Sequence, residues 1–294
     1  MASEARQLAN VILTSEEKQL VKERSPTYYH RVSGCGGCVR AMTLHAYGEP
    51  PSDDTDPTWG NKFRFDQGHD AETRVVKAMQ DAGIHVLLQQ LTVEIETPMG
   101  SKVPGHIDGV VCVPHHLPLG GYWFVMDVKS INAYGFIKTF DEDKVKKDNQ
   151  KQVSIYACST VVDTNQEAIA GHRLKDIKFD GYEFGGGLIA YLAMDRPTRR
   201  VKGEKVDYPK FNLIQFDIPD SVDEYLDLFD EVDIHIKQST LPPIPDVSDE
   251  MVWGGWNRNI KGYKANRCLP RWCQWYSVCH QHKNPQTAKV KEII

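Results

Sequence analysis

No stretch of the chain approaches the roughly 18 consecutive apolar residues that a membrane-spanning helix requires. The first residues, Met1 to Glu17, carry charges and lack the apolar run of a secretory signal. We therefore expect an intracellular, cytoplasmic protein that contacts no membrane.

An excess of positive charge is also lacking, because the 294 residues carry a formal net charge of −5. Taken alone, this argues mildly against a nucleic-acid partner, whose phosphates attract Lys and Arg. The charge is unevenly spread, however. Between Met251 and Lys291 there is no Asp or Glu, whereas eight Lys or Arg and four of the six Trp lie there. Local charge decides what a surface binds, so this stretch is a candidate DNA-binding segment.

Periodicity predicts the order of the elements. Helices are expected near residues 4–24, 39–47, 65–82, 149–162 and 220–237. Strands are expected within 84–97, 103–113, 122–128, 188–194 and 211–218, the last two forming a hairpin with a basic tip. This order predicts an α/β fold in which a mixed sheet is flanked by helices. Three parts are expected: a helical segment (1–60), a core (61–240) and, after a Pro-rich linker, a basic aromatic segment (241–294).

Charged residues end two apolar strands of the core. Gly105-His-Ile-Asp108 is followed nineteen residues later by Asp127, with Lys129 two residues further on. Strand alternation places Asp127 and Lys129 on one face, and an adjacent strand could bring Asp108 beside them. Paired carboxylates favour a cation such as Mg²⁺, and a nearby lysine can orient an attacking water. The set predicts metal-assisted phosphodiester hydrolysis, although for the Asp-x-Lys tripeptide alone a solvated ion pair is the commoner explanation.

Two further motifs accompany these residues. Gln152 and Tyr156 share one helical face, and Gly68-His-Asp-Ala-Glu72 lies upstream on another predicted helix. Together the motifs resemble the RecB-like branch of the PD-(D/E)XK nuclease superfamily, including CRISPR-adaptation and phage-encoded exonucleases. One departure is Ile107, which stands where the motif has proline.

The resemblance implies a restriction-endonuclease-like fold, a role for each motif residue and Mg²⁺ or Mn²⁺ as the cofactor. The metal ligands would be Asp108, Asp127, the backbone carbonyl of Val128, and Glu72, with His69 as the rival to Glu72. Lys129 would be the catalytic lysine. Gln152 would organise the site or touch DNA, and Tyr156 would pack near it or contact DNA.

Cysteines occur at both ends of the chain. Cys268, Cys273 and Cys279 need a fourth soft ligand, which the N-terminal pair Cys35 and Cys38 could supply. The cysteine pattern resembles that of a subset of the RecB-like branch. This resemblance implies a [4Fe–4S] cluster held by Cys38 and the three C-terminal cysteines, which would join the two ends of the chain. A structural zinc site, with His280 or His282 nearby, is the alternative, and Cys35 is the alternative to Cys38. Cys112 and Cys158 are predicted to be buried small hydrophobes.

Aromatic and basic residues alternate in the C-terminal segment. Trp272 and Trp275 are expected to cover the cluster, and Arg258, Lys261 and Lys264 to face DNA with single-stranded character. The expected function is a Mg²⁺- or Mn²⁺-dependent DNA exonuclease acting in recombination, repair or phage DNA processing. The alternatives are a structure-specific endonuclease or nickase, and a catalytically inactive DNA-binding or assembly protein of the same fold.

Overall fold

The computed structural model describes residues 30–47 and 59–242. These residues belong to two compact units. The sheet unit comprises 31–36 and 63–226, and the helical unit comprises residue 30 and the ranges 37–47, 59–62 and 227–242. The helix predicted at 4–24 and nearly all of the C-terminal segment lie outside the described residues.

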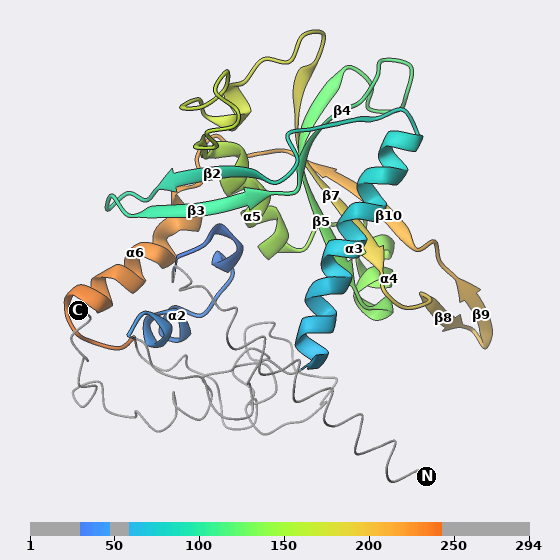
Figure 1. Cartoon of the computed structure of the whole chain (residues 1–294). Helices are drawn as coiled ribbons and strands as arrows, with labels where there is room; N and C mark the ends of the chain where they lie inside the picture. The colour runs from blue at the N-terminus through green and yellow to red at the C-terminus, as the bar shows by residue number, and fades with distance from the viewer. Residues whose placement is uncertain (1–29, 48–58, 243–294) are drawn as a thin grey trace, which may run out of the picture. The chain divides into compact units, whose positions relative to one another are not determined.

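The sheet unit is built on a five-stranded mixed sheet (Figure 1). Its strand order is β1 (His85–Leu87), β4 (Gly109–Cys112), β5 (Tyr122–Ile131), β7 (Glu183–Ala193) and β10 (Phe211–Phe216). The central pair, β5 and β7, is parallel, and the other pairs are antiparallel. The chain therefore has the mixed sheet and the β7–β10 hairpin that its sequence predicts.

Two smaller sheets accompany the main one. The first has the order β3 (Lys102–Ile107), β2 (Leu91–Glu96) and β6 (Thr160–Val161). The second is a two-stranded ribbon of β8 (Thr198–Val201) and β9 (Glu204–Asp207), inserted between β7 and β10. The ribbon corresponds to the predicted basic tip of the hairpin.

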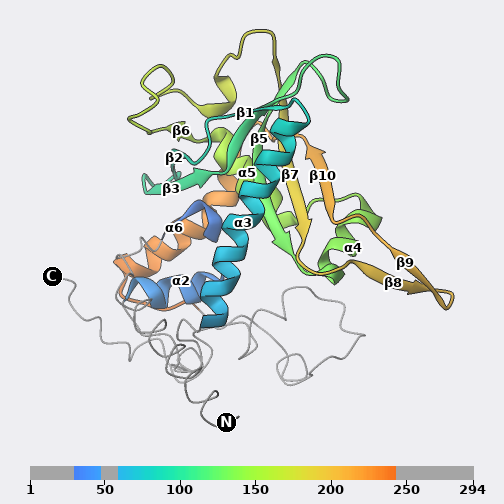
Figure 2. The ribbon, with the colours of Figure 1, turned by 45° about the vertical axis from the view of Figure 1, so that its right-hand side comes forward.

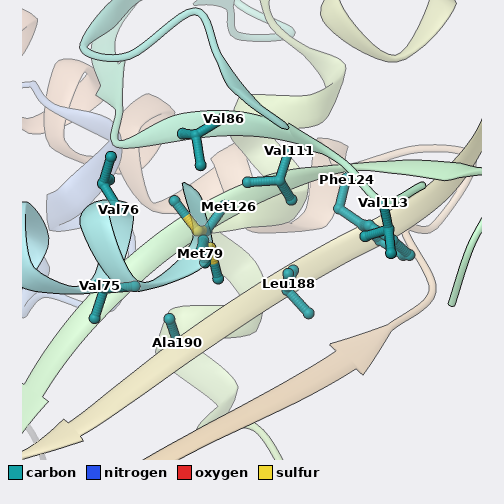
Figure 3. Packing of buried hydrophobic residues seen from close by; sticks show 10 residues of the cluster. All are labelled: Val75, Val76, Met79, Val86, Val111, Val113, Phe124, Met126, Leu188 and Ala190. Carbon is teal, nitrogen blue, oxygen red and sulfur yellow. The ribbon is translucent and has the colours of Figure 1, made fainter. Parts of the chain in front are cut away.

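Helices cover the main sheet. They are α3 (Trp59–Asp81), α4 (Ala133–Glu142) and α5 (Lys147–Cys158), with short 3₁₀ turns η1 (Val32–Gly34) and η3 (Leu174–Asp176). From α3, Val75, Val76 and Met79 pack against apolar side chains of β1, β4, β5 and β7 (Figure 3). Each fully buried aliphatic side chain of this kind stabilises the fold by roughly 1.5–3 kcal/mol.

The two faces of β5 carry different side chains because residues alternate along a strand. Phe124 and Met126 belong to the cluster beneath α3. Asp127, the residue after Met126, therefore points to the other face, where Gln152 of α5 contacts it. A close approach holds α5 against β3, since a Cβ added at Gly105 would lie 2.6 Å from Tyr156 Cε1.

The helical unit contains α2 (Val39–Ala46) and most of α6 (Asp223–Lys237), which begins in the sheet unit (Figure 2). Leu44 and Tyr47 form a small apolar cluster with Leu241 and Ile236. The Tyr47 hydroxyl lies 2.7 Å from the carbonyl oxygen of His235, to which it can donate.

Some observed elements differ from the predicted ones. The strand expected over 84–97 is divided into β1 and β2, because Leu88 and Gln90 have φ angles of 49° and 54° and turn the chain. The helix α4 was not predicted at all. No helix within the described ranges is long and apolar enough to cross a bilayer.

Candidate active site

Asp127 and Lys129 lie at the point where β5 leaves the core. The strand is buried from Trp123 to Asp127 and half-buried from Val128 onward. Lys129 Nζ lies 2.9 Å from Asp127 Oδ1 and 2.8 Å from Oδ2. The lysine therefore neutralises the buried carboxylate from two residues along the same strand.

Asp108 joins β3 to β4 and lies beside Asp127. The antiparallel register pairs Gly109 with Met126, so Asp108 is the next residue opposite Asp127. Its Oδ2 accepts a hydrogen bond of 2.6 Å from the backbone N–H of Val128. Strand pairing thus brings together two carboxylates that are far apart in the sequence.

Helix α5 supplies the remaining contacts to Asp127. Gln152 Nε2 donates to Asp127 Oδ1 at 3.3 Å and lies 2.8 Å from the hydroxyl of Tyr156, one helical turn later. All three side chains are buried. The helical spacing of Gln152 and Tyr156 therefore has a physical consequence, because the tyrosine fixes the amide that holds the aspartate.

The site also includes Tyr191, which the sequence did not single out. In the parallel register of β5 and β7, Tyr191 is the partner of Lys129. Its buried hydroxyl accepts hydrogen bonds from the backbone N–H of Lys146 (3.1 Å) and from Asn149 Nδ2 (2.9 Å). Tyr191 therefore links the start of α5 to the strand that carries the site.

Burial dominates the electrostatics of the two carboxylates. It raises the pKa of Asp108 to about 7, assisted by repulsion from Asp127 and opposed by the Val128 N–H. Burial also raises the pKa of Asp127, although the adjacent Lys129 opposes the shift. For Lys129 itself, burial favours the neutral amine, but attraction to Asp127 and Asp108 outweighs it and raises the pKa.

The charges present suit a divalent cation. Asp127 Oδ2 is buried and accepts no hydrogen bond from the described residues, so the ion pair with Lys129 is its polar contact. The two neighbouring carboxylates both have raised pKa values, and Lys129 is the ammonium group that pairs with Asp127 among the described residues. Hard oxygen donors in this arrangement fit Mg²⁺ or Mn²⁺.

The structure does not bring Glu72 into the same group. In the described part of the chain, no three or more His, Cys, Asp or Glu side chains gather closely enough to hold a metal ion. Glu72, on α3, accepts a hydrogen bond from Gln90 Nε2, and its charge contributes to the raised pKa of Asp108. The rival, His69, is exposed on the same helix. A direct role for Glu72 stays a prediction.

Only part of the predicted cluster site falls within the described residues. Cys38 is half-buried at the N-cap of α2. Cys35 is buried, with its thiol 3.8 Å from the carbonyl oxygen of Asp148, and burial raises its pKa to about 12. Cys112 and Cys158 are buried, as predicted. The other predicted ligands and DNA contacts lie outside the described residues, namely Cys268, Cys273, Cys279, Arg258, Lys261 and Lys264.

Comparisons with known proteins add little. No protein-family model and no curated protein matches the chain. Among solved structures, the crystal structure of SSO0001 is similar with a TM-score of 0.41 and 10% sequence identity, over 78% of this chain and 86% of that one. A likeness at this level carries no argument about function.

Proposed function

We propose that the protein is a metal-dependent deoxyribonuclease of the PD-(D/E)XK type, acting as an exonuclease, with a restriction-endonuclease-like core. The observation that carries the proposal is the environment of Asp127. Its carboxylate is held by Lys129 on its own strand and by Gln152 of α5, with Asp108 beside it at the junction of β3 and β4. A surface ion pair would need neither the burial nor the glutamine.

The oxygen donors available to a metal ion are the carboxylates of Asp108 and Asp127 and the backbone carbonyl of Val128. When bound, Mg²⁺ or Mn²⁺ would lower the pKa of a coordinated water and offset charge on the phosphate. Asp108 must lose its proton to take part, since its pKa is about 7 in the metal-free protein.

The other residues hold charge and position groups. Lys129 presents its ammonium group where it can orient the attacking water or stabilise charge that develops on the phosphate oxygens. Gln152 fixes the orientation of Asp127, and Tyr156 fixes Gln152. The remaining parts of the proposal are a DNA substrate with single-stranded character, contacted by the C-terminal segment, and a [4Fe–4S] cluster held by Cys38 with the C-terminal cysteines.

The test is incubation of end-labelled single- and double-stranded DNA with and without Mn²⁺. We expect Asp127→Ala and Lys129→Ala to lower the cleavage rate at least about a hundredfold, the cost of removing one charge-stabilising group, with fold and DNA binding retained. The matched control is Lys77→Ala, which removes an exposed cation that pairs with Asp81. Wild-type activity in either site variant would refute the assignment. Retained binding without cleavage by the unmodified protein would favour the inactive DNA-binding alternative.

A further inference from the structure

The β8–β9 ribbon concentrates positive charge in an otherwise acidic chain. Between Arg196 and Lys210 there are six Lys or Arg against two acidic residues, whereas the whole chain carries −5. Every residue of β9 is exposed, and all of β8 except Thr198. The ribbon extends away from the main sheet next to α4 (Figures 1 and 2).

The ribbon begins at the edge of the sheet that carries the candidate site. Because β5 and β7 are parallel, they end together, with Ile131 paired to Ala193. The backbone N–H of Met194 donates to the carbonyl oxygen of Ile131 at 2.9 Å, only two residues beyond Lys129. The chain then enters β8 directly.

One face of the ribbon is anchored to α4. Arg199 lies 3.1 Å from Asp141 of α4, and Tyr208 packs edge-on against Phe140 with ring centroids 5.7 Å apart. Strand alternation places Arg199, Val201, Glu204 and Val206 on this side. The anchoring gives the ribbon a defined position within the sheet unit.

The opposite side places like charges together. Arg200 is the direct cross-strand partner of Lys205, an arrangement that destabilises a strand pair unless an anion lies nearby. The one carboxylate on this side, Asp207, already pairs with Arg196 at 2.7 Å and lies 3.9 Å from Lys205. Lys202 adds a cation at the turn, in a left-handed conformation (φ 50°) that more often belongs to Gly, Asn or Asp.

We infer that this side of the ribbon, formed by Arg200, Lys202 and Lys205, binds the phosphate backbone of the DNA substrate next to the scissile bond. The inference rests on the proposed function for the identity of the substrate. Charge complementarity and the shared sheet edge support it. A backbone contact of this kind is independent of base sequence and weakens with salt.

The test compares Arg200→Ala/Lys205→Ala with a control of equal charge change, Lys77→Ala/Lys178→Ala. Lys178 precedes Phe179, which packs on Trp123 near the opposite end of β5, so this cation lies away from the proposed path. Lys77 lies on α3, outside the ribbon, and pairs with Asp81. Fluorescence anisotropy would measure the Kd for a labelled DNA duplex with a single-stranded tail, over a range of salt, with Ca²⁺ replacing Mg²⁺. Hydrolysis of bis(p-nitrophenyl) phosphate with Mn²⁺ would report on the site alone.

We expect the ribbon variant to bind DNA about tenfold more weakly at low salt, and the slope of log Kd against log salt to fall by about 0.9 for each lost contact. The melting temperature should be unchanged or raised, because a repulsive pair is removed, and hydrolysis of the small ester should be unchanged. The inference is overturned if the ribbon variant binds like the unmodified protein, if the control loses as much affinity, or if the unmodified protein does not bind DNA. If binding behaves as expected but neither DNA nor the small ester is cleaved, the ribbon inference stands and the proposed nuclease function fails.

Discussion

At Asp108, the protonation state that the fold favours differs from the one that the proposed function requires. Its carboxyl group is placed beside Asp127, away from full solvation, with one backbone N–H as its hydrogen-bond donor. Below about pH 7 the neutral acid is favoured in the metal-free protein, whereas a metal ligand must be ionised. Protonation of this one group therefore couples pH to both stability and metal affinity.

The first prediction concerns the stability of metal-free protein. A carboxyl whose pKa is raised from 3.8 to about 7 stays protonated in the folded state where the unfolded chain is already ionised. The free energy of unfolding should therefore fall as pH rises between these values, by at most about 1.4 kcal/mol per pH unit from this group. In Asp108→Asn the free energy of unfolding should lose the part of its pH dependence that this carboxyl causes. At pH 8 the variant should therefore be more stable than the unmodified protein. Urea denaturation in EDTA at several pH values measures the effect, and parallel stability curves for both proteins would contradict it.

The second prediction concerns the metal. Below about pH 7, protons compete with the cation for Asp108, so Mn²⁺ affinity should fall by up to about tenfold per pH unit. Calorimetric titration at pH 6 and pH 8 would show this, together with proton release on binding. EDTA should stop DNA cleavage, Mg²⁺ or Mn²⁺ should restore it, and Ca²⁺ should support binding only. Cleavage that resists the chelator would contradict a metal-dependent mechanism.

At the scale of elements, helix α4 adds an exposed aromatic residue to the site edge. The helix follows β5 directly, and the Asn132 side chain accepts a hydrogen bond from the Gly135 N–H as its N-cap. Tyr134, in the first turn, is 81% exposed. A large exposed aromatic side chain five residues after Lys129 is suited to stack on an unpaired base.

We therefore predict that Tyr134→Ala weakens the binding of single-stranded DNA by about 1–3 kcal/mol, the usual contribution of one stacked base. Tyr134→Trp should preserve binding, because it keeps an aromatic face. When the single-stranded tail of a DNA duplex is filled in to give a blunt duplex, the difference in DNA affinity between Tyr134→Ala and the unmodified protein should become smaller. Equal loss with blunt duplex and single strand would argue for a structural role instead.

The sequence predicted the elements whose pattern is local. Strand β5 was recognisable from an apolar run that ends in charge, and the β7–β10 hairpin from two apolar runs around a basic tip. Helix α4 was missed because its small and polar first residues and Gly135 obscured the apolar spacing of Phe136, Ile137 and Phe140. An Asn132 N-cap before that spacing would have revealed it.

Contacts that depend on tertiary pairing were harder to predict. From the sequence alone, Tyr191 looks like any other core aromatic residue of an apolar strand. Only the parallel pairing of β7 with β5 makes it the partner of Lys129. The closeness of Asp108 to Asp127 was expected as a possibility, and the two residues lie directly beyond the Gly109–Met126 pair at the end of the β4–β5 ladder. The ligand role predicted for Glu72 depends on where α3 lies relative to the sheet, which periodicity does not specify.

At the scale of the whole molecule, the prediction with the widest consequence is the metal cluster. Protein purified without oxygen should be brown, with roughly four irons per chain. Replacing Cys38, Cys268, Cys273 or Cys279 by Ser should remove the colour and lower stability, because the cluster would close a very long loop. Cys112→Ser is the matched control, since Cys112 is buried in β4. Cys35→Ser tests the choice within the N-terminal pair: loss of colour in Cys35→Ser but not in Cys38→Ser would make Cys35 the ligand. Colourless protein with one zinc would refute the iron–sulfur assignment and leave the nuclease proposal intact.

The parallel pairing of β5 with β7 also has a kinetic consequence. Between these strands the chain forms α4, α5, β6 and η3, so the pair closes across a long segment. Non-local pairing of this kind is slow relative to helix formation. During synthesis or refolding, Asp127 and Lys129 therefore emerge as neighbours long before Tyr191 and Gln152 can enclose them. Helix content should recover earlier than catalytic competence, and a nascent chain that stops before Glu183 should hold both charged residues without the strand that completes their surroundings.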